Sequence, residues 1–174
     1  MFNAYRITIA ALVAVTASIV AGCNTSPSTD NAAAPSAEGA AYRLASEPAG
    51  AKGVKDVRAD AKDEDEVTVV GRIGGDANPW IEGQSAFLIV DSAMKPCSES
   101  EGCPTPWDYC CDADSLPQSK AMVKVVDAKG KPLAGDARKL FGLKELQTVV
   151  VHGRAKRDEA GNLTVLADGV FVRN

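Results

Sequence analysis

The residues best suited to chemistry in this chain are four cysteines, Cys97, Cys103, Cys110 and Cys111. Five residues separate Cys97 from Cys103, six separate Cys103 from Cys110, and the last two cysteines are adjacent. An even number of cysteines in an oxidising compartment favours two disulfides. Cys97 and Cys103 would then each pair with Cys110 or Cys111, and the sequence leaves the bridging pattern open.

A metal site is the alternative use of these sulfur atoms. Four thiolates bind zinc tetrahedrally, and thiolates also bind copper(I). The spacing counts against zinc, because zinc ligands usually come in pairs two to four residues apart and adjacent side chains do not converge easily on one ion. His152, the single histidine, is a weak further candidate for a metal ligand.

Catalysis finds little support in the sequence. A reactive thiol needs nearby positive charge or a helix start, whereas this segment carries Glu99, Glu101, Asp108, Asp112 and Asp114 and has no Cys-x-x-Cys motif. The nucleophile-elbow, phosphate-loop and paired-histidine motifs are also missing from the sequence. We therefore expect a protein that is not an enzyme and that needs no cofactor, a bound metal ion excepted.

The cysteines lie in a long segment, residues 91–120, that has no hydrophobic periodicity. A connection of this length is usually functional or held by cross-links. It also contains Trp107 and Tyr109, and Trp80 lies in another expected loop. We expect these three aromatic side chains to form a binding surface.

Five segments rich in β-branched and apolar residues predict the strands that position this loop. They are residues 67–73, 86–90, 121–126, 148–155 and 163–172, the last with an interruption near 168–169. Leucines at helical spacing predict one short helix within 135–146.

The order of these elements, with Gly71 bending the first strand and a helix between strands three and four, resembles the OB-fold, a five-stranded Greek-key barrel. The resemblance covers residues 66–173 and rests on the layout of the elements. It implies an all-β barrel domain over 66–174, with the cysteine-rich loop between strands two and three. OB-folds often bind oligosaccharides or nucleic acids through the face of those two strands.

The N-terminus carries a targeting pattern. Arg6 precedes an apolar run over residues 7–20, and the small residues Ala21 and Gly22 lead directly to Cys23. A run of about 15 residues is short for a membrane span, which needs about 20, and the layout is that of a cleavable signal peptide. The cysteine after Ala21-Gly22 makes it resemble the lipobox of bacterial lipoproteins. That resemblance implies lipidation of Cys23 and a lipid-anchored, extracytoplasmic protein on the periplasmic side of a bacterial membrane.

These patterns divide the chain into a signal peptide over 1–22, a disordered tether over 23–65 and the barrel domain over 66–174. The tether is expected because small, polar and charged residues bury too little apolar area to offset the entropy of ordering. Removing residues 1–22 takes away Arg6 and no acidic residue, so 18 basic and 23 acidic side chains remain, a formal charge of −5. This acidic balance makes nucleic acid an unlikely partner.

The sequence as a whole predicts a lipid-anchored, non-catalytic binding or scaffolding module of the cell envelope with a disulfide-stapled loop. Its partner would be an envelope protein or a small ligand. The alternative is a metal- or redox-handling lipoprotein that uses the four cysteines of the loop. A third interpretation is an OB domain that binds oligosaccharide or nucleic acid.

Overall fold

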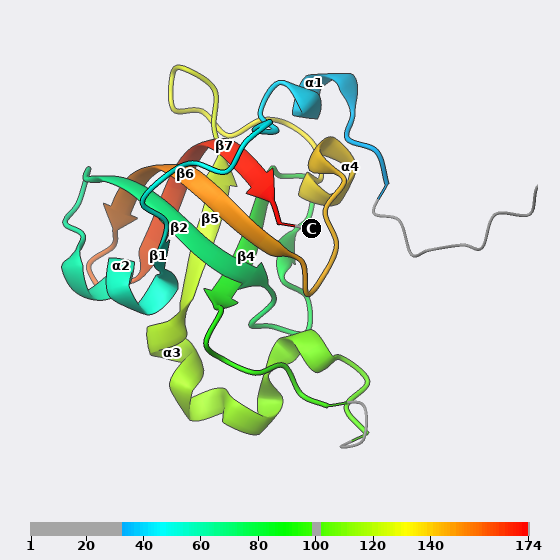
Figure 1. Ribbon diagram of the computed structural model, residues 1–174, viewed down its shortest axis with the longest axis vertical. Coiled ribbons are helices and arrows are strands. Elements are labelled where there is room, and N and C mark those ends of the chain that lie inside the picture. Colours follow the sequence, from blue (N-terminus) through cyan, green and yellow to red (C-terminus); the bar gives the residue numbers. More distant parts are fainter. Residues whose placement is uncertain (1–32, 99–101, 174) are drawn as a thin grey trace, which may run out of the picture. The chain divides into compact units, whose positions relative to one another are not determined.

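The computed structural model describes residues 33–98 and 102–173 (Figure 1). The predicted signal peptide, the lipidation site Cys23 and residues 24–32 of the predicted tether lie outside the described residues. Within the described ranges, no helix is both long and apolar enough to cross a membrane.

The domain is built around a closed barrel of β2 (Glu66–Ile73), β4 (Ala86–Asp91), β5 (Lys120–Val125), β6 (Thr148–Arg157) and β7 (Leu163–Val172). Neighbouring strands run in the order β2-β6-β7-β5-β4, and β2 also pairs with β4, which closes the ring. All of these pairs are antiparallel except β5 with β7, which run parallel (Figure 1). The predicted all-β, OB-like barrel is confirmed.

Short elements decorate the barrel. Two strands that the sequence reading missed, β1 (Lys52–Gly53) and β3 (Trp80–Ile81), pair with β2 and β4. The helices are α1 (Ala37–Ala40), α2 (Val54–Asp60), α3 (Leu116–Ser119) and α4 (Ala137–Phe141), with 3₁₀ turns η2 (Pro106–Asp108) and η3 (Cys110–Ser115).

The expected helix within 135–146 is therefore shorter than predicted. Its start is fixed by Asp136, whose carboxylate accepts a hydrogen bond from the backbone N–H of Arg138. Its end is fixed by Gly142, whose φ of 63° glycine adopts without steric cost.

Alternating side chains fill the barrel. In β5, residues Ala121, Val123 and Val125 are buried and their neighbours are half-exposed, which is the two-residue period of a strand with one buried face. Phe87 and Phe141, both 0% exposed, fill the space between the strands and α4. Each such fully buried side chain contributes roughly 1.5–3 kcal/mol.

The predicted interruption near residues 168–169 is a β-bulge within a single strand. The register between β6 and β7 shifts between His152, opposite Gly169, and Gly153, opposite Ala167. Asp168 is the extra residue, and its side chain is left on the outside.

The predicted tether is wrong from residue 36 onward. Ser36 caps α1, β1 adds to the sheet, and α2 buries Val54 and Val57, which are 0% and 3% exposed. The guanidinium of Arg157 donates to the carbonyls of Val57 and Ala61 and so satisfies the end of α2. The composition of the whole segment is polar, but two buried valines three residues apart and the distant Arg157 hold α2 in place.

Candidate metal centre

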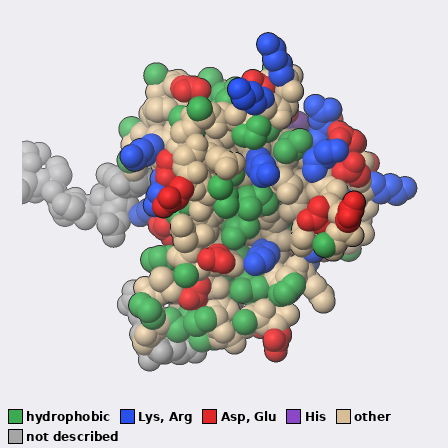
Figure 2. Space-filling view, turned by 180° about the vertical axis from the view of Figure 1, so that it is seen from behind, with side chains coloured by type: hydrophobic (Ala, Val, Ile, Leu, Met, Phe, Trp, Pro, Cys, Tyr) green, Lys and Arg blue, Asp and Glu red, His purple; other side chains and the backbone are tan. Residues whose placement is uncertain are grey.

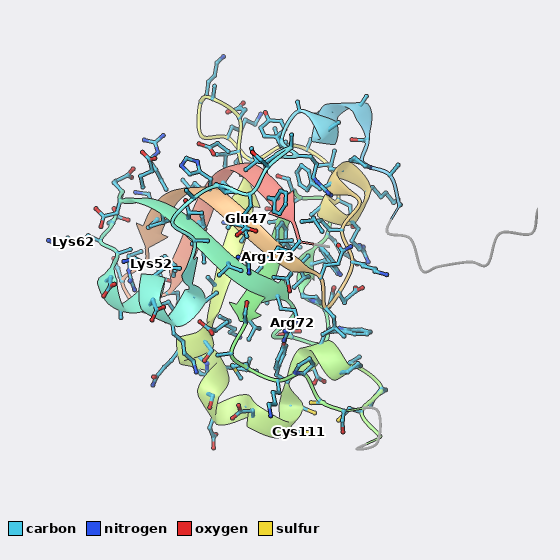
Figure 3. The ribbon with its side chains drawn as sticks, in the orientation of Figure 1. Glu47, Lys52, Lys62, Arg72, Cys111 and Arg173 are labelled. Atoms are coloured by element: carbon cyan, nitrogen blue, oxygen red, sulfur yellow. The ribbon has the colours of Figure 1, made fainter. Side chains whose placement is uncertain are left out.

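The segment between β4 and β5 forms a lobe at one end of the barrel (Figure 1). There the structure brings all four predicted cysteines together, with every pair of sulfur atoms within 4.8 Å. The closest separations are 3.7 Å for Cys97–Cys110, 3.7 Å for Cys103–Cys110 and 3.8 Å for Cys103–Cys111. Figure 3 shows Cys111 in this lobe, below Arg72 of the barrel.

No two of the four sulfur atoms lie at the bonding distance of the predicted disulfides. A disulfide joins two sulfur atoms at about 2.05 Å, whereas these four cysteines carry free thiols. The sulfur of Cys110 is equally close to those of Cys97 and Cys103, so the arrangement does not select one pairing. All four sulfur atoms lie within 4.8 Å of one another, so together they could hold one metal ion.

That geometry matches a tetrahedral metal ion. Four sulfur atoms bound to zinc at about 2.3 Å lie about 3.8 Å apart along the edges of the tetrahedron. The three shortest separations, 3.7–3.8 Å, agree with this edge. Cys97 is buried, Cys103 is half-exposed, and Cys110 and Cys111 face the solvent, so the cluster lies at the surface.

Adjacent cysteines were not expected to converge easily, yet the sulfur atoms of Cys110 and Cys111 both lie in the cluster, and the backbone gives the reason. Tyr109 has φ 58° and ψ 32°, a left-handed conformation that turns the chain sharply before Cys110. The 3₁₀ turn that follows is interrupted at Asp112. Both neighbouring sulfur atoms consequently reach the same cluster.

Crowding controls the pKa values of the thiols. The backbone N–H of Cys111 is the main cause that lowers the pKa of Cys97. The contact with Cys110 raises the pKa of Cys103 to about 11, and the contact with Cys97 raises that of Cys111 to about 11. Deprotonation of one thiol, that of Cys97, is therefore favoured, whereas deprotonation of the others is disfavoured. A nearby cation, such as a bound metal ion, would stabilise the additional thiolates.

The fourth thiol follows the same pattern. The contact with Cys103 lowers the pKa of Cys110, but Asp108 and Cys97 outweigh it and raise the value to about 11. Asp108, one of the acidic residues of this segment, is therefore among the groups that raise a thiol pKa.

Asp108 also holds the loop in shape. One carboxylate oxygen accepts the backbone N–H of Cys110 at 2.9 Å and lies 4.0 Å from the sulfur of Cys97. The other accepts the hydroxyl of Thr105 at 2.6 Å. The Thr105 hydroxyl, followed by the Cys110 N–H, lowers the pKa of Asp108, so the carboxylate stays ionised. Outer contacts of this kind orient metal ligands in proteins.

A small apolar cluster and two hydrogen bonds attach the lobe to the barrel. Tyr109, 0% exposed, packs with Val90, Met94 and Leu116. A guanidinium nitrogen of Arg72 donates to the carbonyl of Met94 at 3.0 Å and lies 3.4 Å from the Tyr109 hydroxyl. The role of Arg72 could not be predicted from the sequence, because a charged residue in a strand carries no signal of what it faces.

Two glycines let the lobe approach β2 and β4. The N–H of Gly75 donates to the carbonyl of Trp107 at 2.8 Å. Gly75 has φ 93°, and a Cβ there would lie 2.6 Å from a methyl group of Val90. A Cβ at Gly74 would lie 2.5 Å from the Trp107 carbonyl oxygen. The Gly74-Gly75 pair, which in the sequence only marked the end of a strand, is thus the detectable signal of this contact.

The predicted aromatic binding surface is wrong for two of its three members. Trp80 is 3% exposed, packs at 5.9 Å from Phe87 and donates its indole N–H to Glu145. Tyr109 is fully buried. Trp107 alone is partly exposed, and its indole N–H donates to the carbonyl of Ala77 at 3.1 Å.

His152 does not join the thiol cluster. Its two ring nitrogens lie 2.8 Å from Asp168 and 3.1 Å from Glu66. Asp168 foremost, with Glu66, raises the pKa of His152. The imidazole, on β6, therefore lies between two exposed carboxylates, that of Asp168 on β7 and that of Glu66 on β2.

An open cleft of about 500 Å³ adjoins the thiols. Its lining includes Lys55, Lys95, Cys97 and Cys111, so two of the four sulfur-bearing residues are reached from it. The face of the molecule shown in Figure 2 mixes apolar side chains with charges of both signs. Phe87 of β4 lies in the core and offers no stacking surface for a base or a sugar.

No family model and no curated protein matches this chain. The thiol cluster and its supporting contacts are the observations on which a functional proposal rests.

Proposed function

We propose that this chain is a lipid-anchored protein of the bacterial cell envelope whose OB-like domain binds one thiophilic metal ion, zinc, through Cys97, Cys103, Cys110 and Cys111. The observation that carries the proposal is the mutual approach of the four sulfur atoms, all within 4.8 Å, at separations that fit a tetrahedral ion. The lipid anchor is supported by the residues that lead to Cys23.

The donor set favours a thiophilic metal over the oxygen-preferring ones, and zinc is the ion that four cysteines bind tetrahedrally in structural sites. Tetrahedral sites of four sulfur atoms suit zinc or iron, whereas calcium, magnesium and manganese prefer oxygen. Four protein thiolates fill the coordination sphere of zinc and leave no position for water, which is typical of a non-catalytic site. The metal would close the lobe in the way that the sequence reading assigned to disulfides.

The domain would act as a non-catalytic module that displays the closed lobe at the envelope. The lobe projects from the barrel (Figure 1) and is fixed to it through the cluster around Tyr109. A metal ion held there would keep Trp107 and the exposed Cys110–Cys111 side of the lobe in one conformation for a partner. An envelope protein or a small ligand remains the expected partner.

The competing proposal is the disulfide-stapled binding module. It is favoured by the oxidising envelope that the lipobox implies and by sulfur pairs only 3.7–3.8 Å apart. The two proposals differ in the oxidation state of the same four atoms, so a single experiment separates them.

The experiment is intact native mass spectrometry of the full chain, purified from membranes in detergent, with metal analysis and thiol alkylation. We expect one zinc per chain and thiols that react only after a chelator removes the metal. Cys110→Ser should lose the metal, while Asp114→Asn, a change at an exposed residue of the same lobe, should keep it. A mass four hydrogens below the fully reduced value, without metal, would replace the metal proposal by the disulfide proposal.

The lipid anchor has its own test. Growth with a labelled fatty acid should label the wild-type chain and leave Cys23→Ala unlabelled. Release of wild-type protein into the soluble fraction would contradict the anchor.

A further inference from the structure

We infer that Arg72 is a positioning residue of the metal centre, and that through Tyr109 it couples metal binding to the barrel. This inference rests on the proposed function. It begins from the setting of Arg72, a charged side chain on β2 that lies between the barrel and the cysteine lobe (Figure 3).

A single nitrogen of Arg72 joins the two arms of the lobe. It donates to the carbonyl of Met94, which precedes Cys97 by three residues, at 3.0 Å. It also lies 3.4 Å from the hydroxyl of Tyr109, which directly precedes Cys110. The arm that brings Cys97 and the arm that brings Cys110 and Cys111 therefore meet at one guanidinium.

The charge of Arg72 has no carboxylate partner among the described residues. Arginine cannot lose its proton in a protein, and a partly buried charge that contacts only neutral acceptors is unfavourable. A divalent ion held by four thiolates has a net charge of −2. Arg72 supplies positive charge at the base of the lobe that would hold such a centre.

Tyr109 provides the mechanical link. Its left-handed backbone turns Cys110 and Cys111 toward the cluster, and a tyrosine adopts that conformation only where its surroundings hold it. Here the ring is fully buried against Val90 and Met94, and its hydroxyl faces Arg72. If the hydroxyl loses this partner, the turn is less firmly held and the sulfur atoms are less well placed.

An ordinary structural role for Arg72 makes a different prediction. If Arg72 only stabilised the barrel, its loss would lower the unfolding temperature equally with and without metal. The loss of a positioning residue would instead change the amount by which the metal raises the unfolding temperature, because such a residue acts on the metal ligands. The difference between the unfolding temperatures of the metal-loaded and the chelator-treated chain therefore separates the two roles.

The test uses full-length Arg72→Met, Arg72→Lys and Tyr109→Phe chains. Zinc affinity is measured by competition with a chromophoric chelator, and cobalt(II) is added in place of zinc to record the tetrathiolate spectrum. We expect Arg72→Met to weaken zinc binding by about tenfold, the lower end of the loss caused by removing an outer contact to metal ligands, because Arg72 reaches the cysteines only through Met94 and Tyr109. Arg72→Lys should recover part of that loss because it restores the charge, and Tyr109→Phe should give a smaller loss.

Arg154→Met is the matched control, because Arg154 is exposed on β6 and its nearest carboxylate, in Glu64, is 3.9 Å away. If Arg72→Met binds zinc as tightly as Arg154→Met, with an unchanged cobalt spectrum, the inference is wrong. If Arg72→Met does not fold, Tyr109→Phe decides, because it keeps the ring and removes only the hydroxyl. A wild-type chain that binds no metal would overturn the proposed function instead.

Discussion

Asp108 is the residue at which the lobe's hydrogen bonds can be removed without touching a sulfur atom. Asp108→Ala removes the acceptors of the Cys110 N–H at 2.9 Å and the Thr105 hydroxyl at 2.6 Å. A hydrogen bond to a charged acceptor contributes about 1.5–3 kcal/mol, and partial exposure reduces this to roughly 1 kcal/mol each. The two bonds together therefore contribute about 2 kcal/mol, which corresponds to about 30-fold in an equilibrium constant.

We expect Asp108→Ala to weaken zinc binding by about 30-fold in chelator competition, because the ligand set must then be ordered without these bonds. Asp108→Asn keeps the shape and one acceptor oxygen, so its loss should be nearer fivefold. Asp114→Ala removes an exposed acid from the same lobe and should leave the affinity unchanged. Equal affinities for Asp108→Ala and wild type would refute the argument, and equal losses for Asp108→Ala and Asp114→Ala would assign the effect to charge alone.

Three further outcomes are expected. Removing the metal with a chelator should leave the strand signal in circular dichroism unchanged, because the barrel core does not include the lobe. The same treatment should speed proteolysis between Cys97 and Cys110. A global loss of the strand signal would contradict this expectation. Val57→Ala should lower the free energy of unfolding by about 1–2 kcal/mol in urea titrations, since the side chain is 3% exposed. A change near zero would mean that α2 is not packed on the barrel and belongs to the disordered tether. Asp168 foremost raises the pKa of His152 above its ordinary 6.5, so the imidazolium stabilises the fold fully below about pH 6.5 and less as pH rises through the folded-state pKa. His152→Gln should flatten the plot of the urea midpoint against pH over this range. Identical plots for His152→Gln and wild type would show that His152 makes no such contribution.

The barrel could be predicted from the sequence because its strands are local patterns. The β-branched runs at 67–73 and 148–155 became β2 and β6, and the helix expected between strands three and four became α4. The closure of the ring followed from the resemblance in element order. The short strand β3 at Trp80 could not be predicted, because two residues carry no periodicity.

The thiol cluster was predicted in its members but not in its geometry. Ligand spacing in known zinc sites argues against adjacent cysteines, and the convergence of Cys110 and Cys111 depends on one left-handed residue, Tyr109. Tyrosine rarely adopts that conformation, so the sequence gives no sign of it. The contacts that hold it come from Val90 and Arg72, which are distant in the chain.

The segment from residue 36 to residue 60 was missed for a related reason. Its partners lie about a hundred residues later: the N–H of Ser36 donates to the carbonyl of Leu140, and that of Leu44 donates to the carbonyl of Val170. Composition averaged over a window cannot register such partners. The lipid on Cys23 stays a prediction.

These same long-range contacts set an order of folding. Glu47 and Arg173 form an ion pair side by side (Figure 3), and Arg157 holds the end of α2 from about a hundred positions away. The segment from residue 36 to residue 60 can close only after β6 and β7 exist, so it is the last part of the domain to fold during synthesis. Until then it lacks the partners that order it, and a truncation that removes β7 and Arg173 would leave residues 44–47 permanently without theirs.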